Sequence, residues 1–279
     1  MAVFDESDKS NAKPVIAVFG AGKIGEALMS GLLHGGHTAD ELLFTERHPE
    51  RAAELTETYG IRGVDIDEAA ARADVLVVAV KPQDIEPLLD KLAPLVTPSK
   101  LVVTLCAGLP TSLFERWLGD VPVVRVMPNT PMVVGEAMSA ISAGAHATPD
   151  HMATVEKMLS CVGQVVELPE SQLNAVTALS GSGPAYFFFL VEAMIDAGIL
   201  LGLPRAIAEK LIIQSAVGSA KMLSDSDAHP VILREAVTSP AGTTINAIRE
   251  LEKHGVRAAL LAAIEAARDR AVELGKAHE

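Results

Sequence analysis

The spacing of apolar positions changes along the chain, and this change predicts two kinds of structure. Up to about residue 168, short β-branched runs alternate with stretches of helical periodicity, and residues 75–80 are apolar throughout, as expected for a strand buried on both faces. The predicted strands are residues 15–19, 42–45, 75–80, 101–105, 121–127, 137–141 and 164–168, and the predicted helices include residues 24–33, 49–59, 84–92, 111–117 and 149–161. Strands joined through helices predict right-handed βαβ units in a doubly wound, parallel α/β sheet of the Rossmann type.

After Pro169 only helical patterns remain, as in residues 205–222 and 258–274, with Pro204 expected at a first helical position. We therefore divide the chain into an α/β domain of residues 14–168 and an all-helical domain of residues 169–279. Residues 1–13 are polar and acidic, which is the opposite of a signal peptide, and they predict a disordered lead-in.

A glycine-rich turn follows the first strand. The segment Gly20-Ala-Gly22-Lys23-Ile24-Gly25 has the spacing Gly-x-Gly-x-x-Gly between a strand and a helix, which is typical of a dinucleotide site. Gly20 is expected to form the tight turn, Gly22 to let the backbone approach a pyrophosphate, and Gly25 to let the helix pack closely on the strand. The unpaired N–H groups of the helix N-terminus would favour the anion. A glycine-rich turn without a ligand is the alternative.

The end of the second strand leaves the choice of cofactor open. Glu46 can accept hydrogen bonds from ribose hydroxyls, which favours NAD(H), whereas Arg47 can pair with a 2′-phosphate, which favours NADP(H). A solvated Glu–Arg pair is the alternative without a ligand. We expect NADP(H) as the cofactor, with NAD(H) also accepted.

Further turns face the same crevice, and they contain Val80, Lys81, Pro82, Ala107, Gly108 and Asn129. Ala107 and Gly108 leave space for a flat nicotinamide ring. Lys81 is expected either to neutralise phosphate or to be solvated, and Asn129 offers a donor and an acceptor near the cofactor. Arg125 lies inside a strand pattern, where the alternative to a functional role is an inward-facing residue paired to a carboxylate.

In the helical part, residues 237–247 read as a helix start rich in hydroxyl groups. Ser239, Thr243 and Thr244 converge on one spot, and the N–H groups of Gly242, Thr243 and Thr244 are expected to be unpaired. Such a helix start can hold a carboxylate as well as a phosphate. An ordinary capped helix is the alternative.

Composition excludes several classes of partner. The formal net charge of −13, without a Lys/Arg cluster, argues against nucleic-acid binding. No run reaches the 18 or so uninterrupted apolar residues of a membrane span. The two cysteines, Cys106 and Cys161, lie in apolar contexts and predict buried thiols rather than a disulfide or a metal site. We expect a reduced cytoplasmic protein with no metal.

Taken together, these stretches resemble the pyrroline-5-carboxylate reductase family over residues 15–274. The resemblance rests on Gly-Ala-Gly-Lys-Ile-Gly at 20–25, Ala-Val-Lys-Pro-Gln at 79–83, Arg-Val-Met-Pro-Asn-Thr-Pro at 125–131, Leu-Ser-Gly-Ser-Gly-Pro-Ala-Tyr at 179–186 and Thr-Ser-Pro-Ala-Gly-Thr-Thr at 238–244. The last two are the most specific. Residues 45–51 and 169–173 look most like actinobacterial members.

The resemblance implies NAD(P)H-dependent reduction of the cyclic imine 1-pyrroline-5-carboxylate to L-proline, the last step of proline biosynthesis. It implies that Ser239, Gly242, Thr243 and Thr244 hold the substrate carboxylate, that Thr244 or a water it positions supplies the proton, and that Asp227 lies near the ring nitrogen. It further implies a homodimer at minimum, built through the helical domain, and a decamer formed as a ring of five dimers as the larger assembly.

Two departures from the family pattern matter. Ala241 stands where the family usually has glycine; if that position needs a positive φ, alanine strains the turn, but we expect the position to tolerate a methyl group. The family often has Asn or Ser where this chain has Glu46. The Gly181–Pro184 stretch is expected to be the entry of the long interdomain helix rather than a nucleophile elbow around Ser182.

Three other functions stay open as alternatives: a related imine reductase, a β-hydroxyacid dehydrogenase, and a non-catalytic NADP sensor. The dehydrogenase is disfavoured, because phenylalanine stands where its catalytic lysine would fall. The sensor has no need for the hydroxyl-rich loop.

Overall fold

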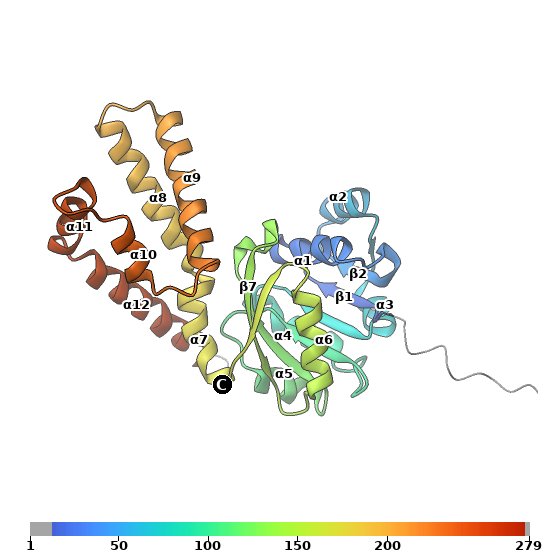
Figure 1. Cartoon of the computed structure of the whole chain (residues 1–279). Coiled ribbons are helices and arrows are strands. Elements are labelled where there is room, and N and C mark those ends of the chain that lie inside the picture. The colour runs from blue at the N-terminus through green and yellow to red at the C-terminus, as the bar shows by residue number, and fades with distance from the viewer. Residues whose placement is uncertain (1–12, 277–279) are drawn as a thin grey trace, which may run out of the picture. The chain divides into compact units, whose positions relative to one another are not determined.

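The computed structural model describes residues 13–276, so most of the predicted lead-in lies outside the described residues. The chain forms two compact units (Figure 1). The first comprises residues up to Gly181 together with those from Arg268 onward, and the second comprises Ser182–Ala267. This division differs from the boundary predicted at residue 168, because residues 169–181 and those from Arg268 onward belong to the first unit.

The first unit contains an eight-stranded sheet in the order β3-β2-β1-β4-β5-β6-β7-β8. Its strands are β1 (Ile16–Phe19), β2 (Leu42–Thr45), β3 (Arg62–Gly63), β4 (Val75–Val78), β5 (Leu101–Thr104), β6 (Val123–Met127), β7 (Ala137–Ala143) and β8 (Gly163–Glu167). The doubly wound sheet is confirmed, but β7 pairs antiparallel with β6. The cause is the connection between them: the short 3₁₀ turn η4 (Thr130–Val134) allows a reversal, whereas a parallel return needs a crossover of a dozen or more residues.

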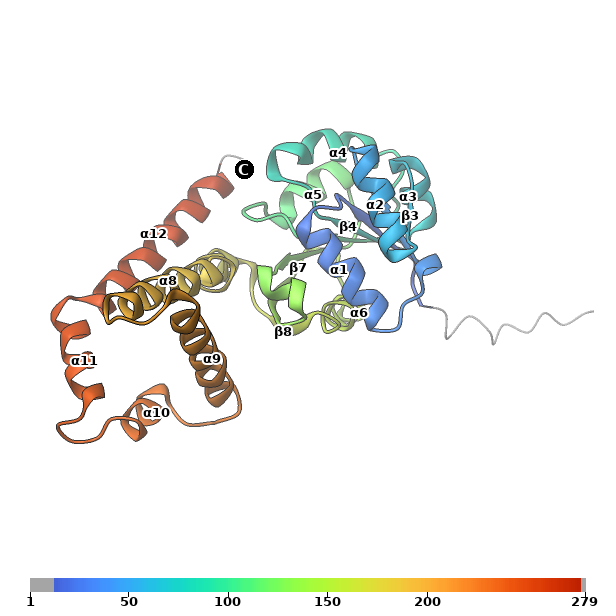
Figure 2. The same cartoon turned by 90° about the horizontal axis from the view of Figure 1, so that it is seen from above.

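Helices cover both faces of this sheet (Figure 2). One core is built on α1 (Lys23–His34), α2 (Pro49–Tyr59) and α6 (Pro149–Leu159), and the other on α3 (Ile66–Arg72), α4 (Ile85–Leu92) and α5 (Thr111–Leu118). The sequence analysis missed β3 and α3. Both β3 residues are exposed, which removes the apolar signal, but Asp65 caps α3 by accepting from the Glu68 N–H, and this Asp-x-x-Glu spacing was a readable signal.

The second unit is entirely helical, with α8 (Gly183–Leu200), α9 (Arg205–Ser224), α10 (Pro230–Ala236), α11 (Thr243–Lys253) and most of α12 (Val256–Lys276). Pro204 is the N-cap of α9 rather than its first helical residue, a shift of one position from the prediction. Among the described side chains of this unit only Ile195 and Ala208 are buried. Large apolar side chains such as Phe188 and Leu200 are exposed, so one copy of this unit has almost no core of its own.

The segment that joins the two units is helical before it reaches α8. The 3₁₀ turn η5 (Glu170–Gln172), α7 (Leu173–Val176) and the π-helical turn η6 (Thr177–Gly181) precede Ser182, which itself has helical dihedrals. The predicted helix entry at Gly181–Pro184 is confirmed, since α8 begins at Gly183 with Ser182 as its N-cap and Pro184 in its first turn, but the residues before this entry are already helical. Pro184 has no N–H to donate to Ser180 O, four residues earlier, and that carbonyl accepts from the Asn129 side chain instead (3.4 Å).

Candidate functional site

The glycine turn between β1 and α1 has the shape that a dinucleotide requires. Gly20 has a φ of 99°, and a Cβ there would lie 3.0 Å from Ala79 O. A Cβ on Gly25 would collide with Gly20 O, so the helix approaches the strand only because Gly25 has none. At Gly22, the N-cap of α1, a Cβ would meet nothing within 4 Å. The backbone is thus open on the side where a pyrophosphate would approach, and these residues fit the predicted cofactor.

The other predicted cofactor residues gather at the same edge of the sheet. Strands β1, β2, β4, β5 and β6 are parallel, so their carboxyl ends lie together. The residues that follow these ends are Lys23, Ile24, Glu46, Arg47, Val80, Lys81, Pro82, Ala107, Gly108 and Asn129. A crevice outside the carboxyl ends of such strands is where open α/β sheets bind ligands.

Arg47 and Glu46 are both engaged within the protein. Arg47 forms a two-bond ion pair with Asp84, Nη1 to Oδ1 at 3.0 Å and Nη2 to Oδ2 at 3.1 Å. The Glu46 carboxylate accepts from the His48 N–H at 3.0 Å. Asp84 was not among the predicted site residues. Its position just after the end of β4 was the signal that could have found it.

The space predicted at Ala107 and Gly108 is bordered by the end of α12, which the sequence analysis did not predict. Gly108 has a φ of 79°, and a Cβ there would lie 3.6 Å from Leu274 Cβ, near the end of α12. Ala107 is exposed. The C-terminal end of α12 therefore packs against the turn after β5 and limits the room beside it.

Cys106, which precedes this turn, has its thiol in an environment that disfavours the thiolate. It is buried and its Sγ contacts Val80 O at 3.3 Å. Burial raises the pKa of the Cys106 thiol to about 11, because the thiolate would lose its hydration. This agrees with the predicted buried thiol, whereas Cys161 is only half-buried.

Arg125 faces inward and pairs with a carboxylate, which was the alternative to a functional role for this residue. Its Nη1 donates to Glu170 Oε1 at 3.1 Å, and Glu170 also accepts from the Thr111 N–H (2.8 Å) and hydroxyl (2.9 Å) at the start of α5. The Arg125 side chain is 6% exposed, and its Nη2 is buried without a partner among the described residues. Glu170 thus fastens the start of the joining segment to the sheet and neutralises a buried cation.

Asn129 uses its whole amide inside the first unit. Its Nδ2 donates to Ser180 Oγ (3.2 Å) and its Oδ1 accepts from the Met138 N–H (3.0 Å). The predicted donor is therefore occupied, and the predicted acceptor already takes one bond. This geometry makes Asn129 a residue that positions the π-turn η6.

The predicted substrate residues all lie in the helical unit. Thr243 and Thr244 are the first two residues of α11, where N–H groups have no acceptor within the helix. The prediction that the Gly242 N–H is unpaired is wrong, since it donates to Ser239 O at 3.1 Å. A Cβ on Gly242 would collide with Ser239 Oγ, so this glycine lets the hydroxyl approach the helix start. Asp227 is exposed in the connection between α9 and α10.

Ala241 occupies a backbone conformation that favours glycine. Its φ is 56°, and it is the only non-glycine residue with positive φ in the described part of the chain. The condition under which alanine strains this turn is therefore met, because left-handed backbone costs an L-residue about 1–2 kcal/mol. The loop before α11 therefore holds an alanine in a backbone conformation that favours glycine.

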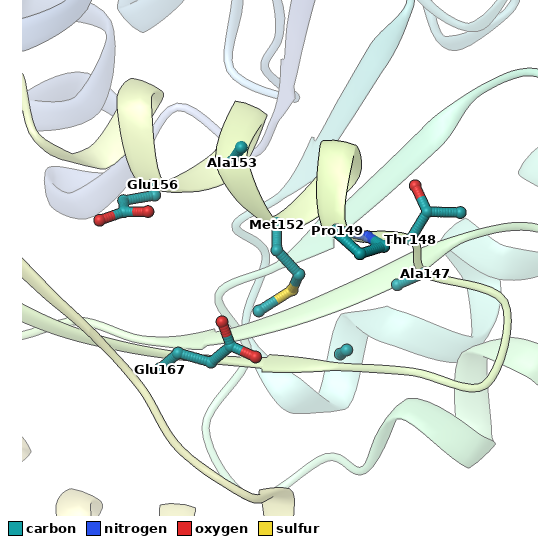
Figure 3. Close-up of a pocket in the computed structure, with 8 residues that line it drawn as sticks. Ala147, Thr148, Pro149, Met152, Ala153, Glu156 and Glu167 are labelled. Atoms are coloured by element: carbon teal, nitrogen blue, oxygen red, sulfur yellow. The ribbon is translucent and has the colours of Figure 1, made fainter.

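A pocket of about 440 Å³ lies elsewhere, between α6 and strands β7 and β8. The side chain of Met152 points from α6 toward Glu167 on β8, and Glu156 lies along the same helix (Figure 3). Because β7 and β8 end the sheet on the side away from β2, this pocket is separate from the dinucleotide edge. It contains none of the predicted site residues.

The helical run Glu170–Leu200 is long and apolar enough to cross a membrane, as judged by length and composition alone. Only a small part of its surface is buried within one chain. Its first part is nevertheless bonded to the sheet, through Glu170 and Ser180, and Glu192 and Asp196 interrupt its second part.

The fold and the glycine turn define a two-unit oxidoreductase that binds a nicotinamide dinucleotide. Residues 15–108 match the family described as NADP oxidoreductase coenzyme F420-dependent, and residues 170–274 match pyrroline-5-carboxylate reductase dimerisation. A pyrroline-5-carboxylate reductase from Corynebacterium melassecola is 45% identical over 94% of this chain and 98% of its own, and one from Mycobacterium tuberculosis is 43% identical over 93% and 96%. The chain belongs to the pyrroline-5-carboxylate reductase family, and its resemblance to actinobacterial members is confirmed.

Solved structures agree. A pyrroline-5-carboxylate reductase from Coxiella burnetii superposes with a TM-score of 0.89 at 35% identity, covering 94% of this chain and 99% of that one. The Plasmodium falciparum enzyme, solved with NADP bound, has a TM-score of 0.86 at 28% identity, covering 94% and 98%.

Proposed function

We propose that this enzyme transfers hydride from NAD(P)H to 1-pyrroline-5-carboxylate and so forms L-proline, the last step of proline biosynthesis. One observation carries the proposal: an open glycine cradle and a hydroxyl-rich helix start occur in one chain that is 45% identical, over 94% of its length, to a relative of that name. NADPH and NADH are both accepted.

The cofactor is held in the first unit. Gly20, Gly22 and Gly25 and the N-terminus of α1 hold the pyrophosphate, and Glu46 and Arg47 face the adenosine ribose. The turns at residues 80–82 and 107–108 border the nicotinamide, which supplies hydride from its C4 when bound.

The substrate is held in the helical unit. Ser239, Thr243 and Thr244 bind its carboxylate, using hydroxyls and the first-turn N–H groups of α11. Thr244, or a water at its hydroxyl, delivers a proton to the ring nitrogen, which makes the neighbouring carbon electrophilic. Asp227 stabilises the protonated nitrogen. Because protonation is the only activation that the imine needs, orientation supplies most of the rate gain, about 7–11 kcal/mol for well-placed reactants.

Steady-state oxidation of NADPH by pyrroline-5-carboxylate tests this function, and Thr244→Ala tests the loop. Loss of a proton-delivering group lowers kcat about 10²-fold or more, while the Kd for NADPH changes less than about twofold. Thr244→Ser, which keeps the hydroxyl, restores most of the rate. Thr154→Ala, which removes a hydroxyl bonded to Asp150 O on α6, is the control. Equal losses in kcat and in NADPH affinity for Thr244→Ala contradict this assignment.

The exposed apolar surface of α8 and α9 is covered by a second copy of the chain. Phe187, Phe188 and Phe189 lie on this surface, which supports an interface rather than a membrane span. Five such dimers form a ring, a decamer, in a cytoplasmic enzyme that binds neither membranes nor nucleic acid. Light scattering that finds a stable, active monomer contradicts the dimer, and a dimer mass at high concentration contradicts the ring.

A further inference from the structure

The Arg47–Asp84 pair bridges two strand ends that lie on either side of the glycine turn. Arg47 follows β2 and Asp84 ends the 3₁₀ turn η3 (Pro82–Asp84) after β4, and both strands neighbour β1 in the sheet. Two parallel bonds of 3.0 and 3.1 Å join the guanidinium to the carboxylate. The pair therefore spans the carboxyl end of β1, beside the place where the adenosine half of a dinucleotide lies.

We propose that Asp84 is a specificity-determining residue for the cofactor: it holds the Arg47 guanidinium and opposes the 2′-phosphate, and so shifts the enzyme from NADPH toward NADH. This inference rests on the proposed cofactor site. The bidentate geometry that Arg47 uses for Asp84 is the same geometry with which guanidinium groups grip phosphate. A 2′-phosphate must therefore compete with Asp84 for Arg47.

The local charge acts in the same direction. Asp84 places one carboxylate on the Arg47 guanidinium, and Glu46, the residue before Arg47, carries a second carboxylate that is fixed by the His48 N–H. Lys23 and Lys81, the other cations at these strand ends, are exposed. A 2′-phosphate adds negative charge to this corner, whereas the 2′-hydroxyl of NADH can donate to Glu46.

The strength of the pair sets the size of the effect. The Arg47 side chain is 74% exposed and the Asp84 side chain 27%, so the bond is screened by water and can be displaced. Removing the Asp84 carboxylate frees the Arg47 guanidinium to bind the 2′-phosphate, and it also removes the repulsion between that carboxylate and the phosphate. From these two weak contributions, Asp84→Asn strengthens binding of a 2′-phosphate about three- to tenfold and changes binding of a 2′-hydroxyl cofactor less than twofold.

Calorimetric titration of the intact enzyme with 2′,5′-ADP and with ADP measures this effect without catalysis. The expected result is tighter binding of 2′,5′-ADP to Asp84→Asn with unchanged binding of ADP, and a matching rise in the ratio of kcat/KM for NADPH over NADH. In the Arg47→Ala background the same change gives a smaller gain, because only the repulsion is then removed. Glu68→Gln, which also removes one carboxylate paired with arginine in this unit, is the control.

Three outcomes overturn the inference. Unchanged or weaker binding of 2′,5′-ADP to Asp84→Asn shows that Asp84 does not oppose the phosphate. An equal gain in Glu68→Gln, or a gain of undiminished size without Arg47, shows that net charge alone acts. A wild-type enzyme that binds neither nucleotide overturns the proposed cofactor site itself, and is thereby distinct from the first two outcomes.

Discussion

Glu170→Ala is expected to destabilise the first unit strongly, because it leaves the Arg125 cation buried without its carboxylate. The Arg125 side chain is 6% exposed, and one of its Nη atoms already has no partner among the described residues. Breaking a buried ion pair by removing one partner costs about 3–5 kcal/mol. The Glu170 side chain is 29% exposed, so water can enter the space that it leaves. The expected cost is therefore at the lower end of this range, about 3 kcal/mol. Loss of the two bonds to Thr111 at the start of α5 adds about 1 kcal/mol.

The total of about 4 kcal/mol corresponds to a fall in Tm of roughly 8–16 °C for a domain of this size. The fluorescence of Trp117 reports the transition, because it is the single tryptophan of the chain and it lies in α5, packed against the core. The enzyme is heated at one fixed concentration, so that assembly contributes equally to every variant.

Two variants separate the buried charge from other causes. Asp120→Asn removes an exposed pair with His146 and is expected to change the free energy of unfolding by less than about 1 kcal/mol. Arg125→Met combined with Glu170→Ala removes the cation as well and should recover much of the loss. If Glu170→Ala melts within the range of Asp120→Asn, Arg125 is neutralised by something else and the reasoning is refuted.

Two further predictions concern single side chains. Ala241→Gly relieves a left-handed residue with a φ of 56° and should raise the free energy of unfolding of the helical unit by about 1 kcal/mol, seen as a higher Tm in circular dichroism; an unchanged or lower Tm would mean that the methyl group packs favourably. Cys106, with a pKa of about 11, should resist a thiol reagent in the folded enzyme at pH 8, whereas Cys161 reacts first. Rapid labelling of Cys106 in the folded enzyme would contradict this expected resistance. Because the pKa of Cys106 is raised above its ordinary value of 9.0, the contribution of its protonated thiol to the free energy of unfolding is full below pH 9 and is lost as the pH rises toward 11.

The sequence predicted those features that depend on local patterns. Helix α2 and strand β2 have the predicted bounds, since periodicity and β-branched runs are read within a few neighbouring residues. The glycine turn was also predictable, because each of its glycines answers a steric demand close in the chain.

Features that depend on distant pairing were not predicted. Arg47 and Asp84 are separated by 37 positions, and Arg125 and Glu170 by 45, so only the order of the strands brings them together. The antiparallel direction of β7 and the positive φ of Ala241 could have been predicted from the sequence. The first follows from the short connection after β6, and the second from the glycine that the family has at this position.

The π-turn η6 places Ser180 where Asn129 can bond it. Each residue of an α-helix turns the chain by about 100°, and a π-turn contains an additional residue within one turn. A chain with one residue fewer between Thr177 and Ser180 would therefore turn Ser180 away from Asn129. The two bonds from the Asn129 side chain to Ser180 thus depend on the number of residues in this turn.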